Sequence, residues 1–204
     1  MMKKGKCYSK VNRGQRKKSD FYETPYSMTR QFLDALHVKN IEHTHVCEPA
    51  CGHGAITKVL IEKNFDRVTN YDIIGNLKLD YLEDDYTYDC VITNPPYSLA
   101  DEFIEHALDN NTSYMIALLL PLNYLQGVRR YEKKLFEKLT YVYVFTRMPM
   151  LGETLRNDGK YNTGMQAYAW YVWDLTIPIL QINPPQIYWI NNNDYVIRKE
   201  DKNG

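Results

Sequence analysis

The segment Asn94-Pro95-Pro96-Tyr97 follows an apolar stretch, residues 88–93, that has the composition of a buried strand. Proline fixes the backbone φ angle and has no N–H, so the carbonyls of this loop are left to accept hydrogen bonds. Open α/β sheets bind ligands in the crevice at the carboxyl ends of their strands. A loop rich in acceptors and poor in donors, with an aromatic ring beside it, suits a planar group that carries an exocyclic amine. A nucleobase fits that description.

A second motif lies upstream, in residues 46–54 (Val-Cys-Glu-Pro-Ala-Cys-Gly-His-Gly). It consists of a short apolar stretch, the acid Glu48 and the pair Gly52 and Gly54. Apolar residues then recur with helical spacing over residues 55–64. The order strand, Gly-x-Gly, helix is typical of a nucleotide-binding turn, because glycine lets the backbone approach a ligand closely.

The two motifs in this order resemble motifs I and IV of the S-adenosylmethionine-dependent amino-methyltransferases, and of the adenine-N6 DNA methyltransferases in particular. The resemblance extends from Asp20 to Asp174. Three shorter matches support it: Asp20-Phe21-Tyr22-Glu23-Thr24-Pro25, which resembles motif X; Tyr71-Asp72-Ile73, which resembles the acidic end of the second strand; and Asp80-Tyr81-Leu82, which resembles the element that receives the cofactor's adenine.

The resemblance implies that the protein binds S-adenosylmethionine. Gly52 and Gly54 would allow close approach at a helix N-terminus, whose partial positive charge suits a carboxylate. Asp72 is expected to accept hydrogen bonds from ribose hydroxyls, and Glu48 to meet the cationic amino group. The expected cofactor-binding residues are Phe21, Tyr22, Thr24, Pro25, Glu48, Ala50, Gly52, Gly54, Asp72, Ile73, Asp80, Tyr81 and Asn94.

The implied reaction is methyl transfer to the N6 amine of adenine in DNA, with Asn94, Pro95, Pro96 and Tyr97 as catalytic residues. The Asn94 side-chain oxygen and the Pro95 carbonyl would accept the amine hydrogens, which frees the nitrogen lone pair for attack. Positioning and electrostatics carry such a step, and no separate general base is required. Tyr97 would stack on a base flipped out of the duplex. The run 168–173 resembles motif VIII, and on that resemblance Tyr171 is expected to form a second aromatic wall.

The pattern of apolar segments predicts an α/β protein with a Rossmann-like class I methyltransferase fold. Strands are expected near residues 44–48, 67–72, 88–93, 113–121 and 140–146, and helices near 55–64, 98–109 and 128–138. A first helix would follow Pro25, with Ser27 as its N-cap. Residues 166–175 and 187–196 would complete a mostly parallel sheet as an antiparallel C-terminal hairpin, with helices on both faces.

Charge is divided unevenly along the 204 residues, although the net charge is zero. Residues 1–18 hold eight of the 25 basic residues and no acid, so the remainder carries 17 bases against 25 acids. This composition predicts a basic, disordered arm that contacts nucleic acid, followed by one methyltransferase domain at 19–204. The family's separate target-recognition domain is not expected, so reading would fall to loop 147–166, to the arm, to residues 123–134 or to a partner. Expected nucleic-acid contacts are Lys17, Lys18, Arg129, Arg130, Arg147, Arg156 and Lys160.

Several alternatives stay open at this level. The same loop motif occurs in RNA adenine methyltransferases and in enzymes that methylate a glutamine amide, and an inactive nucleic-acid-binding subunit is another reading. A homodimer or a separate specificity subunit is compatible with the sequence. The mean hydropathy of −0.52 and the absence of a long apolar run predict a protein without a membrane segment. Four cysteines without paired spacing indicate a reduced cytoplasmic protein. The expected setting is a bacterial or phage-infected cell, and no metal site is expected.

Overall fold

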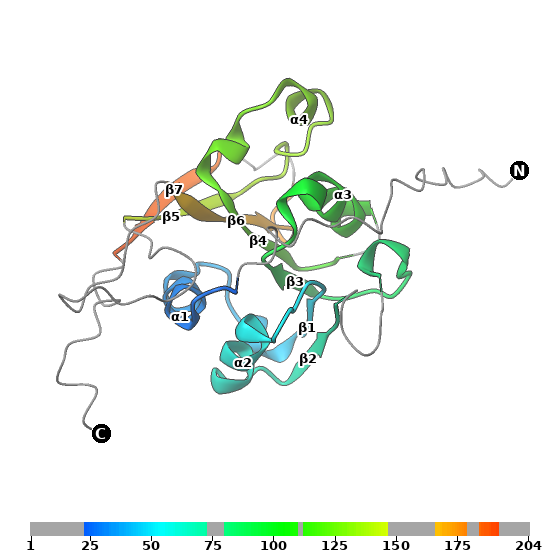
Figure 1. Cartoon of the computed structure of the whole chain (residues 1–204), viewed down its shortest axis with the longest axis vertical. Helices are drawn as coiled ribbons and strands as arrows, with labels where there is room; N and C mark the ends of the chain where they lie inside the picture. Colours follow the sequence, from blue (N-terminus) through cyan, green and yellow to red (C-terminus); the bar gives the residue numbers. More distant parts are fainter. Residues whose placement is uncertain (1–22, 73–79, 110–111, 147–165, 179–183, 192–204) are drawn as a thin grey trace, which may run out of the picture.

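The computed structural model describes residues 23–72, 80–109, 112–146, 166–178 and 184–191. These form a seven-stranded sheet in the order β2-β1-β3-β4-β6-β5-β7 (Figure 1). The strands are β1 (His45–Glu48), β2 (Arg67–Asn70), β3 (Cys90–Thr93), β4 (Met115–Pro121), β5 (Tyr141–Phe145), β6 (Tyr168–Asp174) and β7 (Gln186–Ile190). The α-helices of the described part are α1 (Tyr26–Ala35), α2 (Ala55–Glu62), α3 (Ala100–Asp109) and α4 (Val128–Glu132). The predicted α/β class is confirmed.

Strands β2, β1, β3 and β4 are parallel to one another. Strand β6 lies between β4 and β5 and is antiparallel to both, so the antiparallel hairpin consists of β5 and β6. The last strand differs from the predicted pairing. β7 does not pair with β6 but lies parallel to β5 at the edge of the sheet.

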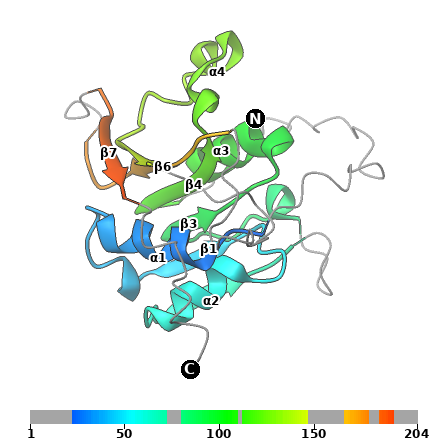
Figure 2. The same cartoon turned by 60° about the vertical axis from the view of Figure 1, so that its left-hand side comes forward.

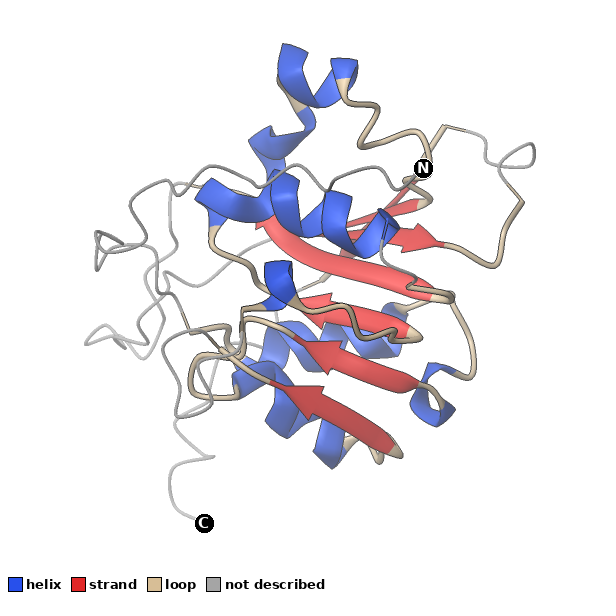
Figure 3. Ribbon diagram, turned by 90° about the vertical axis from the view of Figure 1, so that its right-hand side faces the viewer, coloured by secondary structure: helices blue, strands red, loops and turns tan. Residues whose placement is uncertain are grey.

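Helices cover both faces of the sheet, as predicted (Figures 2 and 3). On one face, Phe32 of α1 and Ile56 of α2 pack with the ring of Trp170 in one core cluster. On the other face, Phe103 of α3 packs with Tyr171 in a second cluster. All seven residues of β4 are buried, which explains its continuous apolar sequence. Among the described helices, none is long and apolar enough to span a membrane.

Two predicted helix boundaries are wrong. Helix α1 begins at Tyr26 with Pro25 at the N-cap position, so Ser27 lies inside the helix and does not cap it. Helix α4 is five residues long, and residues 133–138 form turns instead of the predicted continuation. The chain enters the left-handed region at Lys134 (φ 58°). There the N–H of Lys134 donates to Tyr131 and the N–H of Leu135 to Arg130, a hydrogen-bond pattern that closes a helix.

Candidate active site

The two sequence motifs meet at the carboxyl ends of two neighbouring strands. β1 and β3 are adjacent and parallel, so the glycine turn that follows β1 lies beside the Asn94 loop that follows β3. From β1 the chain moves outward to β2 on one side and returns to β3 on the other. In open α/β sheets such a reversal opens a crevice at the carboxyl ends of the strands, where ligands bind.

The glycine turn and the acid after β2 are in direct contact. Gly52 and Gly54 have φ angles of 53° and 78°, which favour glycine, and Gly54 is the N-cap residue of α2. The N–H of Gly52 donates to Asp72 Oδ2 at 3.0 Å. Asp72 itself lies two residues beyond the end of β2, where the chain has left the strand. The structure therefore brings together three residues that the sequence assigned to one binding site.

Glu48 lies at the end of β1, under the first turn of α2. Its side chain is buried, and Oε2 accepts hydrogen bonds from the backbone N–H of Thr57 at 2.6 Å and from the Thr57 hydroxyl. Burial raises the pKa of Glu48 to about 8, although the hydrogen bonds from Thr57 act in the opposite direction. Burial therefore favours the protonated carboxyl group, and a cation placed beside it would favour the ionised form. Ala50, two residues on, is half-buried and packs on the α3-side cluster.

The catalytic candidate Asn94 contacts a residue that lies 70 positions earlier. Its Nδ2 donates to Thr24 Oγ1 at 3.0 Å, and both Thr24 and Pro25 are buried just before α1. Pro95 is buried and Pro96 half-buried, so the loop is held against the body of the protein. The predicted cofactor contacts Phe21, Tyr22 and Ile73 lie outside the described residues.

Tyr97 has an aromatic neighbour on β6, but not the one predicted from the resemblance. Tyr171 is fully buried in the α3-side cluster, and its hydroxyl donates to the carbonyls of Pro121 and Leu122 at 3.0 and 3.2 Å. This burial does not fit a wall that contacts a base. Tyr168, on the other face of the strand, has its ring centroid 5.8 Å from that of Tyr97, with the ring planes 42° apart. Side chains alternate across a strand, so Tyr168 and Tyr171 lie on opposite faces of the sheet, and both are buried.

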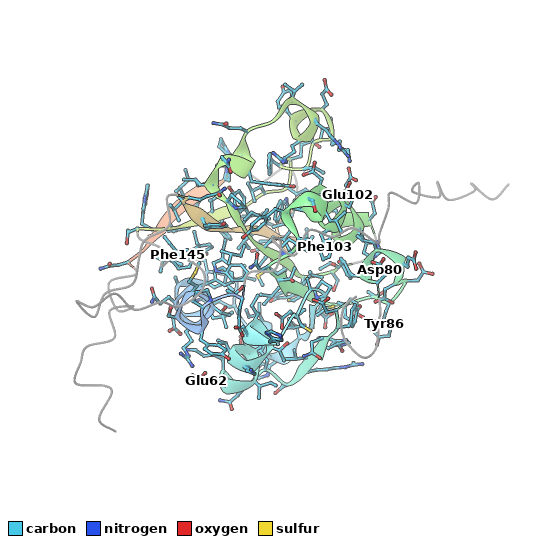
Figure 4. The ribbon with its side chains drawn as sticks, in the orientation of Figure 1. Glu62, Asp80, Tyr86, Glu102, Phe103 and Phe145 are labelled. Atoms are coloured by element: carbon cyan, nitrogen blue, oxygen red, sulfur yellow. The ribbon has the colours of Figure 1, made fainter. Side chains whose placement is uncertain are left out.

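The segment predicted to receive adenine is held by its own contacts. Asp80 Oδ1 accepts from the N–H of Leu82 at 3.1 Å and so caps a short 3₁₀ helix, Tyr81–Glu83. Tyr81 is buried, with its ring edge-to-face against His106 of α3 at 4.5 Å. Figure 4 shows Asp80 on the same side of the molecule as Phe103. The contact of Asp80 and Tyr81 with the cofactor's adenine stays a prediction.

A cavity of about 410 Å³ opens beside Tyr97, between the start of α3 and the start of α4. Its lining includes two acids, Asp101 and Glu102, and two of the predicted nucleic-acid contacts, Arg129 and Arg130. Asp101 and Glu102 were not predicted as site residues. They follow Tyr97 by four and five residues, at the start of the helix predicted over residues 98–109, and this position is the sequence signal that could have indicated them.

The two arginines differ in their contacts. Arg130 Nε donates to Asp101 Oδ1 at 2.9 Å, Nη1 donates to the carbonyl of Gln126 at 2.6 Å, and the guanidinium lies 3.7 Å from the ring centroid of Tyr124. The Arg130 side chain is thus committed to contacts within the protein, which does not fit its predicted contact with nucleic acid. The Arg129 side chain is 67% exposed and lies 3.7 Å from Glu102. The other predicted contacts Lys17, Lys18, Arg147, Arg156 and Lys160 lie outside the described residues.

Comparison with known proteins identifies the fold. No family model and no curated protein matches the sequence. Among solved structures, a Listeria monocytogenes protein proposed to be a class I S-adenosylmethionine-dependent methyltransferase has a TM-score of 0.59 at 14% identity, over 89% of this chain and 70% of its own. A Pyrococcus horikoshii protein proposed to be an RNA methyltransferase has a TM-score of 0.55 at 16% identity, over 75% and 85% of the two chains. A 23S rRNA methyltransferase has a TM-score of 0.54 at 12% identity, over 79% and 72%. The chain therefore has the fold of the class I methyltransferases.

Proposed function

We propose that this protein transfers a methyl group from S-adenosylmethionine to the exocyclic N6 amine of adenine in DNA. The observation that carries the proposal is the adjacency of the Asn94-Pro95-Pro96-Tyr97 loop and the glycine turn at the carboxyl ends of β3 and β1. A methyl donor and an amine acceptor must lie side by side for transfer. The pairing of β1 with β3 makes these two loops neighbours in space, although they lie far apart in the sequence.

The glycine turn offers groups that fit the proposed cofactor. Gly52 and Gly54 form a turn without side chains at the start of α2, where a carboxylate is favourable. Asp72, already in contact with this turn, provides a carboxylate for hydroxyl groups, and Glu48 provides a buried acid that a cationic amine would ionise. S-adenosylmethionine, when bound, supplies a methyl group on a positively charged sulfur that a nucleophile can attack.

In the proposed reaction, Asn94 Oδ1 and the Pro95 carbonyl accept the two hydrogens of the adenine amine. These hydrogen bonds would draw the nitrogen toward tetrahedral geometry, so that its lone pair is no longer delocalised into the ring. As the new C–N bond formed, the methyl–sulfur bond would break and leave a neutral thioether, and the surplus amine proton would pass to water. The hydrogen bond from Asn94 Nδ2 to Thr24 fixes the amide in one orientation. Tyr97 holds the face of the base, and Tyr168 is the aromatic neighbour that completes the wall on the β6 side.

The experiment that tests this proposal is methyl transfer from labelled S-adenosylmethionine to genomic DNA that lacks adenine methylation, with the product nucleosides identified by mass spectrometry. Asn94→Ala is expected to lower the rate by about 10²–10³-fold, by analogy with the loss of one oxyanion-hole donor. Its cofactor affinity, measured by calorimetry, should stay within about threefold. Asn40→Gly is the matched control, because Asn40 lies in a left-handed turn at the opposite end of the strands and glycine keeps that backbone.

RNA is the second candidate substrate, because two of the proteins with this fold are described as RNA methyltransferases. A parallel reaction with unmodified RNA and single-stranded DNA separates the two. If N6-methyladenine formed in RNA alone, RNA and not DNA would be the substrate. A methylated product other than N6-methyladenine, or an Asn94→Ala variant with most of its activity, would reject the assignment of the amine and of Asn94.

A further inference from the structure

The segment that follows β4 displays three apolar side chains to solvent. Leu125 ends a short 3₁₀ helix, Leu122–Leu125, and is 41% exposed, while Val128 and Tyr131 on α4 are 73% and 84% exposed. Of the exposed large hydrophobic residues in the described part of the chain, Tyr131 has the greatest exposed fraction. Clustered apolar side chains at the surface mark interaction sites more often than isolated ones do. We name residues 125–131 the α4 tip.

The α4 tip borders the proposed active site. Gly127, Val128 and Arg129 line one side of the cavity of about 410 Å³, and Tyr97 of the catalytic loop lines the other. In Figures 1 and 2, α4 stands away from the sheet beyond α3, and in Figure 4 Glu102 lies toward it. A strand whose target base reached Tyr97 would therefore pass the α4 tip with its neighbouring nucleotides.

The tip is held in place by the Arg130 network. Arg130 binds Asp101 of α3 and the carbonyls of Tyr124 and Gln126, and so it ties both ends of the turn to α3. Gly127 has a φ of 135°, which favours glycine, and a Cβ there would lie 3.1 Å from Arg130 Nη1. An exposed aromatic ring on a fixed turn loses little conformational entropy on binding, which favours affinity.

The bases near the tip lie among an equal number of acids. Residues 123–138 carry five bases and two acids, and Asp101, Glu102 and Glu105 of α3 pair with Arg130, Arg129 and Lys133. The side chain of Arg129 is nevertheless mostly exposed. Exposed pairs contribute little free energy, about 0–1 kcal/mol, so a phosphate can compete for Arg129. Tyr131 lies two positions along α4 from Arg129, and exposed aromatic rings and cations are the groups with which proteins bind unpaired nucleotides.

We propose, on the basis of the function proposed above, that Tyr131 stacks on an unpaired nucleobase next to the target adenine while Arg129 contacts the adjoining phosphate. The α4 tip thus forms the nucleic-acid contact that positions the strand over Tyr97. Val128 supplies apolar contact to the same nucleotide. Asp101 and Arg130 position the tip and do not touch the strand.

The test is the affinity of the full chain for labelled oligonucleotides, measured by fluorescence anisotropy with single-stranded DNA, duplex DNA and RNA of the same sequence. Tyr131→Ala is expected to weaken binding by about 5- to 150-fold, the range that corresponds to the loss of one stacked base. Tyr131→Phe and Tyr131→Trp should stay within about threefold of wild type, because they retain the ring. Tyr86→Ala is the matched control, since Tyr86 is also exposed (51%) and lies on another part of the molecule (Figure 4). Comparison of the DNA and RNA oligonucleotides shows which kind of nucleic acid is bound.

Calorimetry with S-adenosylmethionine and the midpoint of thermal unfolding accompany every variant, and both should match wild type because Tyr131 is exposed. Wild-type protein that methylates nucleic acid together with a Tyr131→Ala variant of unchanged affinity would overturn this inference and leave the proposed function standing. Equal weakening by Phe and Ala would overturn stacking, because the hydroxyl would then make the contact. Wild-type protein that binds S-adenosylmethionine but no oligonucleotide would overturn both proposals.

Discussion

Glu48 illustrates how the surroundings of one side chain set its charge. The residue sits at the carboxyl end of β1, where the sequence predicted a contact with a cationic amine. The structure adds that Glu48 is buried and that Thr57 supplies its hydrogen bonds. Two donors would suit a carboxylate, yet burial dominates and raises the pKa. The proposed cofactor site thus contains a titratable group whose ionisation is coupled to the binding of a cation.

This raised pKa predicts a specific dependence of stability on pH in the absence of cofactor. The folded-state pKa of Glu48 is about 8, above its ordinary value of 4.5, so the folded protein binds more protons than the unfolded chain between these values. Its contribution to stability therefore falls as pH rises from about 4.5 to 8 and is constant above that. Glu48→Gln removes the titration and keeps an acceptor for Thr57.

The measurement is the midpoint of thermal unfolding for wild type and Glu48→Gln from pH 5 to pH 9. The midpoint of the variant relative to wild type should increase with pH across that window and level off near its upper end. Glu42→Gln is a control, because Glu42 is not buried and lies before β1. A difference between Glu48→Gln and wild type that does not change with pH would show that Glu48 is ionised in the folded protein.

Elements differ in how far the sequence determined them. β3 and β4 were predicted closely because their apolar runs end at strong signals, Pro95 after one and Pro121 at the end of the other. The pairing of β7 was not predicted correctly, because a sequence pattern shows the two faces of a strand but not which strand lies beside it. The same limit affected Tyr171: alternation separated two faces of β6 correctly, while only the folded sheet shows that Tyr168 is the one near Tyr97.

The end of α4 was missed for a different reason. Helices that close with a left-handed residue usually have glycine there, and this chain has Lys134. A non-glycine residue in that conformation costs about 1–2 kcal/mol. The next residue, Leu135, is only 3% exposed. Its burial stabilises the turn and explains why the turn forms in spite of that cost. The site loops were better predicted than this turn because their glycines and prolines lie in the sequence itself.

Lys134→Gly is accordingly expected to stabilise the protein by about 1 kcal/mol relative to Lys134→Ala. Both variants lose the exposed ion pair between Lys134 and Glu137, so that contribution cancels in the comparison. Urea unfolding monitored by circular dichroism gives the two free energies of unfolding. An alanine variant as stable as the glycine variant would mean that the turn at Lys134 does not persist in solution.

At the scale of the whole molecule, the fold arranges the candidate site, whereas the distribution of charge concerns the binding of phosphates. The sheet places the two loops of the candidate site side by side, and the α4 tip lies at its border. The described residues leave out the most basic stretch of the chain, residues 1–18. Its composition, eight bases and no acid, is nevertheless fixed by the sequence. Such a stretch can neutralise phosphates wherever they lie, but it offers no apolar pattern with which to build a surface for base edges.

Deletion of residues 1–18 is therefore expected to weaken binding to DNA strongly at low salt and to leave the preferred methylation sites unchanged. Each phosphate contact that is lost lowers the slope of log affinity against log salt by about 0.9 for duplex DNA, so the slope should flatten by several units. A second variant, in which glutamine replaces the eight bases, keeps the length of the chain and should behave like the deletion. Filter binding across a salt series, beside sequencing of methylated sites, compares both variants with wild type. An unchanged salt slope would show that the arm does not contact phosphates, and a shifted set of methylated sites would show that it takes part in reading the sequence.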